Sequence, residues 1–281
     1  MRRQMKEEQK TAAEYVKEVK RLRTYWLILG IIGFVLFIPL LTLIILHDNV
    51  ATFILFFLLF LLLTISLKIR KRVLQIRTIL TMNCDHRKYT EINLQLVERP
   101  FYNKIGISNY KNYFQAMSDY YDGDFVGMTG HLEGINLEKG TLDLKLQYYN
   151  LLGNYYKESN DLQGLKQTID DVRALRNQKK FPKRLIPFYD SLETIFHRHY
   201  LVLTNDKKLL TKLFDFLATE QELLKKVSIH FEIGRSYFNS ATFAQAEKHL
   251  NYVIEHGEKT YYALYAQQII EKMNEEDWAD F

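Results

Sequence analysis

The chain has 281 residues, one cysteine and a formal net charge of +5. A single cysteine excludes an intrachain disulfide and is typical of a reducing compartment. The positive charge gathers in two short segments, since residues 1–24 carry eight Lys and Arg against four Glu, and residues 68–77 carry five with no acid. Residues 78–281 hold 25 basic and 28 acidic side chains, a net charge of −3. We therefore expect no nucleic-acid partner.

The first segment, residues 1–24, is predicted to form a basic cytoplasmic helix. Its apolar side chains recur at helical spacing: they are Ala12, Tyr15, Val16, Val19 and Leu22. Three placements stay open for this face. It lies on a membrane surface, packs against the domain that follows, or leads as a solvated helix into the next segment.

Residues 25–67 are almost entirely apolar. Two runs, 26–46 and 51–67, flank a short polar break that contains Asp48, the one charged residue of the segment. Each run is about as long as a helix needs to cross a hydrocarbon core of roughly 30 Å at about 1.5 Å per residue. The pattern predicts a transmembrane helical hairpin with spans at 26–46 and 51–67.

The basic flanks predict the orientation of this hairpin. Lys and Arg precede the first span and follow the second, whereas the polar break between the spans has neither. Because Lys and Arg collect on the cytoplasmic side, both termini are expected in the cytoplasm. The flanks also attract anionic lipid headgroups. Abundant Lys, Asn, Ile and Tyr favour a bacterial plasma-membrane protein.

The rest of the chain, residues 68–274, has a helical pattern that repeats. The clearest unit is 227–257, where Gly234 allows two helices to approach closely and Tyr237 fills the gap beside it. Ala246 then faces the tyrosine from the second helix, after a turn at 239–242. A small residue three positions before a tyrosine thus identifies the first helix of each helix pair.

Fainter copies share this spacing. In residues 146–177, Gly153 precedes Tyr156 by three positions, and Leu165 follows it by nine. Further turns are predicted at 83–86, 120–125, 160–161 and 205–206, and a closing helix at 260–273. The pattern contains four to five helix pairs.

These units resemble the tetratricopeptide (TPR) repeat, although unit 227–257 has His230 where that family has its opening Trp, and it lacks the closing Pro. The resemblance implies an α-solenoid, and other helix-pair solenoids stay open. The predicted fold class is therefore all-α: a two-helix transmembrane hairpin followed by a TPR-like α-solenoid, with an acidic tail at 275–281.

The resemblance also implies a binding groove, because in that family the first helices of the units line a concave surface. The corresponding side chains here are Gln147, Asn150, Asn154 and Lys157 in one unit, and Ser228, Phe231, Arg235 and Phe238 in another. Asn150 and Asn154 lie one helical turn apart, where paired amides can hold an extended peptide backbone, and Lys157 can meet a carboxylate. The alternative is that these are ordinary solvated positions and that the aromatic ones belong to the core.

Signs of catalysis are missing from the sequence. It contains none of the common glycine-rich phosphate-binding, nucleophile-elbow or zinc-protease motifs. His197 and His199 are two positions apart, which on a helix points them about 200° apart and is poor metal geometry. We expect neither an enzyme nor a metal site nor a small-molecule cofactor.

The predicted function is that of a membrane-anchored cytoplasmic scaffold or adaptor, which binds a protein or peptide segment at the inner membrane face. Two alternatives stay open. One is a sensor that binds a cytosolic peptide and signals through the hairpin. The other is a structural subunit of a larger membrane complex, in which the spans pack on partner helices.

Overall fold

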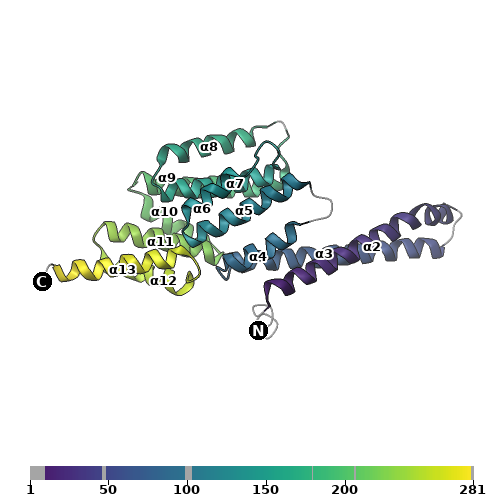
Figure 1. Ribbon diagram of the computed structural model, residues 1–281, viewed down its shortest axis with the longest axis horizontal. Helices are drawn as coiled ribbons and strands as arrows, with labels where there is room; N and C mark the ends of the chain where they lie inside the picture. The colour runs from purple at the N-terminus through teal and green to yellow at the C-terminus, as the bar shows by residue number, and fades with distance from the viewer. Residues whose placement is uncertain (1–9, 46–48, 99–102, 179, 206, 280–281) are drawn as a thin grey trace. The chain divides into compact units, whose positions relative to one another are not determined.

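The computed structural model describes residues 10–45, 49–98, 103–178, 180–205 and 207–279 (Figure 1). Within these ranges the chain is helical and has no strand, which confirms the predicted all-α class. It divides into two compact units, Met1–Ile79 and Leu80–Phe281. The expected domain boundary at residue 68 falls inside a long helix, α3 (Asn49–Thr81).

Unit 1 consists of α2 (Ala12–Ile45) and most of α3. Two contacts join these helices: Trp26 Nε1 donates a hydrogen bond to Ser66 Oγ at 2.9 Å, and Arg72 Nε lies 3.1 Å from Glu18 Oε2. Glu18, which comes first in α2, contacts Arg72, whereas Trp26, which comes later, contacts Ser66, which precedes Arg72 in α3. The two helices therefore run antiparallel, side by side (Figure 1).

One helix among the described residues is long and apolar enough to cross a membrane. It is Thr52–Thr81, whose most apolar window has a mean hydropathy of 2.5 and no buried residue. Its exposed side chains include Phe53, Phe56, Phe57 and Phe60. Residues 26–45 of the expected first span lie within α2, whereas its last residue, 46, and residues 47–48 of the polar break lie outside the described residues.

The start of α2 has an apolar face that is covered by protein. Ala12, Tyr15, Val16 and Val19 are buried, and Leu22 is half-buried. These are the side chains whose spacing predicted a helix. Residues 1–9 of the expected basic helix lie outside the described residues.

Unit 2 is a succession of helices that pack on their neighbours in sequence. α4 contacts α5, α5 contacts α6, α7 contacts α8, α9 contacts α10, and α11 contacts both α10 and α12, which in turn contacts α13. Their bounds are α4 His86–Val97, α5 Lys104–Asp122, α6 Phe125–Glu133, α7 Leu142–Glu158, α8 Leu162–Arg176, η1 Lys183–Leu185, α9 Ile186–Leu203, α10 Leu209–Thr219, α11 Leu223–Asn239, α12 Phe243–His256 and α13 Tyr261–Ala279. α13 extends through most of the expected acidic tail, up to Ala279.

Several connections between these helices occur where turn residues predicted them, whereas those at 134–141, 177–182 and 220–222 were not predicted. Asp124 and Asp161 cap the N-termini of α6 and α8, with side-chain oxygens that accept from backbone N–H groups three residues on. Gly123, Asn160 and Ala241 have positive φ angles of 80°, 55° and 51° at the ends of α5, α7 and α11. Short turns of this kind reverse the chain between neighbouring helices.

The two glycines of the repeat pattern stand at close helix contacts, but with different partners. A Cβ on Gly234 would lie 2.7 Å from Leu250 Cδ2, on the second helix of the same unit. A Cβ on Gly153 would instead lie 2.4 Å from Phe196 Cε1, on α9 of the next unit. Gly153 therefore sets the spacing between α7 and α9, which belong to successive helix pairs. The site residues described below lie on α7, α9 and α11.

Candidate functional site

Polar side chains join α7, α9 and α11 on the faces that these helices turn toward one another. His199 Nε2 on α9 donates to Asn154 Oδ1 on α7 at 2.7 Å. The neighbouring Arg198 donates from a terminal nitrogen to Ser228 Oγ on α11 at 3.3 Å. Arg198, His199 and Ser228 are buried. Since buried polar groups are costly without partners, these contacts fix how the three helices pack.

A buried charge cluster lies beside these contacts. Lys157 Nζ on α7 lies 2.5 Å from Glu232 Oε1 on α11, and it also pairs with Glu158. Arg235 lies 3.5 Å from Glu158 Oε2. The Lys157 and Glu232 side chains are only 1% and 2% exposed. Removing one charge from such a pair leaves the other buried without compensation.

The charges shift the pKa values of these groups. Burial opposes the charge of Lys157, but the carboxylates of Glu158 and Glu232 outweigh it and raise the pKa of Lys157. Burial likewise opposes the charge of Glu232, yet the charges of Lys157 and Arg235 lower its pKa. Burial, and then Lys157, lowers the pKa of His199 well below its ordinary value, so His199 is neutral at pH 7.

Tyrosines connect this cluster to the first and last parts of unit 2. The Tyr120 hydroxyl on α5 lies 3.1 Å from the Tyr261 hydroxyl and 2.9 Å from the Tyr262 hydroxyl, both on α13. Tyr261 then donates to Glu158 Oε1 at 2.7 Å. Burial raises the pKa values of Tyr120 and Tyr261 far above 10, so both act as neutral hydroxyls.

A cavity of about 240 Å³ opens beside the polar contacts. The polar side chains of α7, α9 and α11 that line it include Asn150, Asn154, Arg198 and Ser228. Apolar side chains, among them Ile195 and Ile229, form other parts of its wall. Two buried polar atoms of these residues, Asn150 Oδ1 and Arg198 Nε, have no hydrogen-bond partner among the described residues. An acceptor and a donor of cavity-lining residues are thus unused there.

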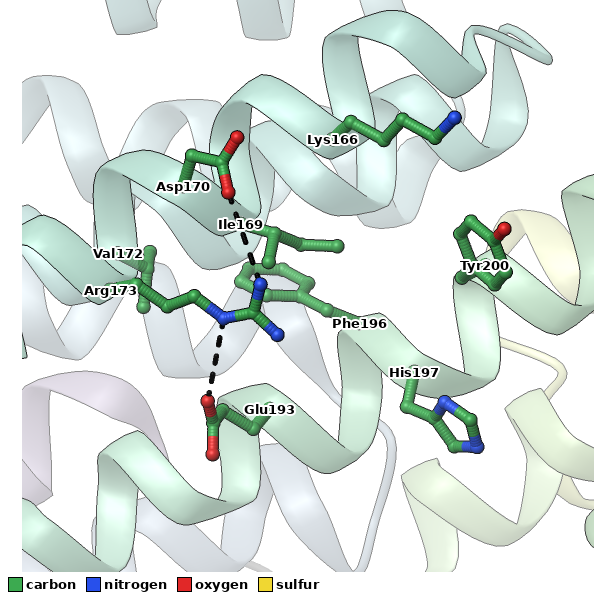
Figure 2. Close-up of a pocket in the computed structure, with 9 residues that line it drawn as sticks. All are labelled: Lys166, Ile169, Asp170, Val172, Arg173, Glu193, Phe196, His197 and Tyr200. Carbon is green, nitrogen blue, oxygen red and sulfur yellow. Dashed lines mark ion pairs between the residues drawn. The ribbon is translucent and has the colours of Figure 1, made fainter.

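A larger cavity, of about 580 Å³, lies between α8 and α9 (Figure 2). Figure 2 shows Arg173 between Asp170 and Glu193, each at 3.9 Å. These side chains are more than 45% exposed, and exposed ion pairs of that length contribute little. The lining includes Phe196 but none of the eight predicted groove residues.

The eight predicted residues fall into three environments. Asn150, Asn154 and Ser228 line the smaller cavity, whereas Lys157 and Arg235 belong to the charge cluster. The remaining three are engaged elsewhere: Gln147 donates to Asp143 Oδ2 at 2.7 Å, Phe231 is buried in the apolar core, and Phe238 packs near Phe243. Lys157 and Phe231 are therefore not open to a bound segment.

Three important residues were absent from the predicted site. Arg198 stands between two histidines in the sequence, and Glu158 and Glu232 gave no motif. Glu232 did carry a signal, because it lies between the apolar Phe231 and Ile233 on a helix that is buried on most sides. A carboxylate in such a position needs a cation, which only the structure identifies as Lys157.

Metal binding finds no support among the described residues, since no three His, Cys, Asp or Glu side chains there gather closely enough to hold an ion. His197 is exposed and His199 is buried, as expected for imidazoles on opposite sides of one helix. The donor set of the site is made of amides, a hydroxyl and a guanidinium, which bind peptides and oxyanions rather than metals.

Comparison with known proteins adds no relative. No family model matches the chain, and neither the curated proteins nor the solved structures contain a match. The resemblance to the TPR repeat therefore rests on the residues of the repeat pattern alone.

Proposed function

We propose that the chain is a membrane-anchored adaptor, whose helical domain binds a segment of another protein at the cytoplasmic face. The observation that carries the proposal is the convergence of Asn150, Asn154 and Ser228 on one cavity, although they come from helices far apart in the sequence. Amides and hydroxyls are the groups that hold a peptide backbone.

The membrane anchor is proposed from the apolar surface of unit 1. Both α2 and α3 expose large apolar side chains, such as Phe34 and Val35 on one helix and Phe53 and Phe56 on the other. A patch of this size is unfavourable in water and favourable in lipid. We propose two spans, 26–46 and 51–67, in the plasma membrane of a bacterium, with both termini in the cytoplasm and the helix pairs of unit 2 arranged as a TPR-like solenoid.

In-cell crosslinking tests the adaptor function. Asn154 is half-buried and bonded to His199, so a bulky probe there would disturb the site. Thr194 lines the same cavity and is exposed, which makes it the better position for a photoreactive residue. We expect a discrete protein partner to be captured from Thr194, and capture to fall when Asn150→Ala is added.

Lys248 provides the control position, because it is exposed on α12 and lines neither cavity. Capture of the same proteins from Thr194 and Lys248, or capture that Asn150→Ala leaves unchanged, would contradict binding at this cavity.

A second candidate, a subunit of a larger membrane complex, is favoured by Gly30 and Gly33. A Cβ at either position would meet nothing within 4 Å, so the surface there has room for another helix. Replacing residues 25–67 by an unrelated two-span anchor tests this. A pure adaptor keeps its captured partner after the exchange, whereas a subunit held by its spans loses it.

A further inference from the structure

In the part of the chain that the structure describes, the charges around Lys157 are paired, except for that of Arg198. Two buried cations, Lys157 and Arg198, lie with two anions, Glu158 and Glu232, and a third cation, Arg235, has a side chain that is 40% exposed. Lys157 pairs with both anions and Arg235 with Glu158. Arg198 is close enough to lower the pKa of Glu232, but no carboxylate of the described residues lies within ion-pair distance of it. Among the described residues, Arg198 is therefore the one buried cation of this cluster without an ion-pair partner.

Arg198 is also poor in hydrogen bonds. A guanidinium has five N–H donors, and Arg198 uses one of them, toward Ser228, within the described part of the chain. Its Nε is buried without a partner, and the residue as a whole is only 9% exposed. A buried charge without a counterion is costly, so an anion that reaches Arg198 through the cavity would be favoured.

Neither of the two carboxylates that line the cavity lies within ion-pair distance of Arg198. Glu220 and Glu222 both pair with Lys225, at 3.7 Å and 3.0 Å. Glu220 also accepts two backbone N–H bonds. The adjacent His199 is neutral and adds no charge of either sign.

The cavity wall next to Arg198 offers groups that suit an oxyanion. A guanidinium fork matches the planar oxygens of a carboxylate or the oxygens of a phosphate. Ser228 Oγ accepts the bond from Arg198 with a lone pair, which leaves its own O–H to donate. Asn150 lines the same cavity, and its amide nitrogen adds a donor near its unused oxygen. The volume of about 240 Å³ is below that of ordinary drug-sized pockets, so it admits one small group.

We propose that this cavity is an oxyanion site, in which Arg198, with Ser228 and Asn150 beside it, binds a single carboxylate or phosphate group. The inference goes beyond the adaptor function and does not depend on it. A free anion and an acidic side chain of a protein segment present the same chemistry to Arg198.

Thermal unfolding of the purified full-length chain in detergent tests the site. The probes are sodium phosphate, sodium acetate and N-acetyl-aspartyl amide, each titrated at constant ionic strength with chloride as the balancing ion. We expect at least one probe to raise Tm saturably, by about 4 °C when it is present at ten times its Kd. A saturable response to phosphate or acetate that exceeds the response to the blocked aspartate indicates a free ion, and the reverse order indicates a side chain.

Two substitutions at Arg198 and one control make the test specific. Arg198→Met removes the charge and is expected to abolish the rise in Tm. Arg198→Lys keeps the charge without the planar guanidinium and is expected to raise the apparent Kd about tenfold. Arg173→Met removes an exposed arginine of the α8–α9 cavity and should leave the response unchanged.

Two results would overturn the proposal. One is a wild-type protein whose Tm responds to none of the three probes. The other is a rise in Tm that persists in Arg198→Met. If Arg198→Met fails to fold, an unchanged apparent Kd in Arg198→Lys would have the same meaning. Neither result bears on the adaptor function, because crosslinking from Thr194 reports a protein partner whether or not an anion binds.

Discussion

The substitution Glu232→Gln tests the charge cluster most directly. Gln has nearly the same shape as Glu and can still accept a hydrogen bond from Lys157, so the change removes a charge and little else. It leaves Lys157, Arg198 and Arg235 against Glu158 alone. The excess of positive charge in the cluster thereby rises from one to two, beside a side chain that is 2% exposed, although Arg235 is 40% exposed.

The expected cost follows from this burial. Breaking a buried ion pair by removing one partner costs about 3–5 kcal/mol, because the remaining charge has neither counterion nor water. We take about 3 kcal/mol for Glu232→Gln, since the amide retains the hydrogen bond. For a domain of about 200 residues this lowers Tm by about 9 °C.

The assay is thermal or urea unfolding of the full-length chain in detergent, followed by circular dichroism. Asp215→Asn is the matched control, because it removes an acid that pairs with Lys212 at 3.5 Å on the surface, where the side chains are 61% and 48% exposed. We expect that control to change the free energy of unfolding by less than about 0.5 kcal/mol.

A second substitution and a pH series sharpen the result. Adding Lys157→Met to Glu232→Gln restores the original excess of one charge and should recover part of the loss, a non-additive effect. The folded-state pKa of Glu232 is lowered, so its contribution is present above the unfolded-state pKa of about 4.3 and is lost as the pH falls through the folded value. A loss below about 1 kcal/mol for Glu232→Gln, or strict additivity, would refute the reasoning.

Three further predictions concern packing, pH and reactivity. Gly153→Ala places a methyl group 2.4 Å from Phe196 and should cost about 1–3 kcal/mol in urea unfolding, whereas Gly130→Ala, with open space around it, should be neutral or stabilising. Burial lowers the pKa of His230 to about 4, whereas the imidazole of the unfolded chain takes up its proton near pH 6.5. The free energy of unfolding should therefore fall as the pH is lowered from 6.5 to 4, and this part of the fall should be missing in a pH series on His230→Gln. Cys84 is buried and its pKa is raised to about 11, so maleimide should modify it slowly at pH 7.5 and rapidly in urea, which mass spectrometry checks; rapid labelling of the folded chain would contradict its burial.

The sequence predicted the helical class and several of the places where the chain reverses, because both depend on local chemistry. A capping aspartate such as Asp161, or an asparagine with positive φ such as Asn160, acts on its immediate neighbours. The pairing of Gly234 with the helix that contains Leu250 was predictable for the same reason. The packing of Gly153 against α9 was not, because it joins successive units.

The candidate site could be predicted only in part. The repeat pattern placed Asn150 and Asn154 on one helix face, and both line the cavity. It could not reveal that Lys157 meets Glu232, since that contact spans 75 positions and depends on how α7 packs with α11. The burial of Arg198 likewise depends on the packing of helices that are far apart in the sequence.

The tyrosine contacts also have a consequence for how unit 2 folds. In an open array of helix pairs, each pair touches only its neighbours, so stability is local and folding can start anywhere. Here Tyr120 and Tyr262, which are 142 positions apart, join α5 to α13, and Lys157 reaches Glu232 across an intervening unit. Such contacts require large loops to close, which slows folding and couples distant parts into one cooperative transition. During synthesis, a nascent chain that ends before α11 therefore exposes the inner faces of α5 and α7, and it completes them only when the last helices emerge from the ribosome.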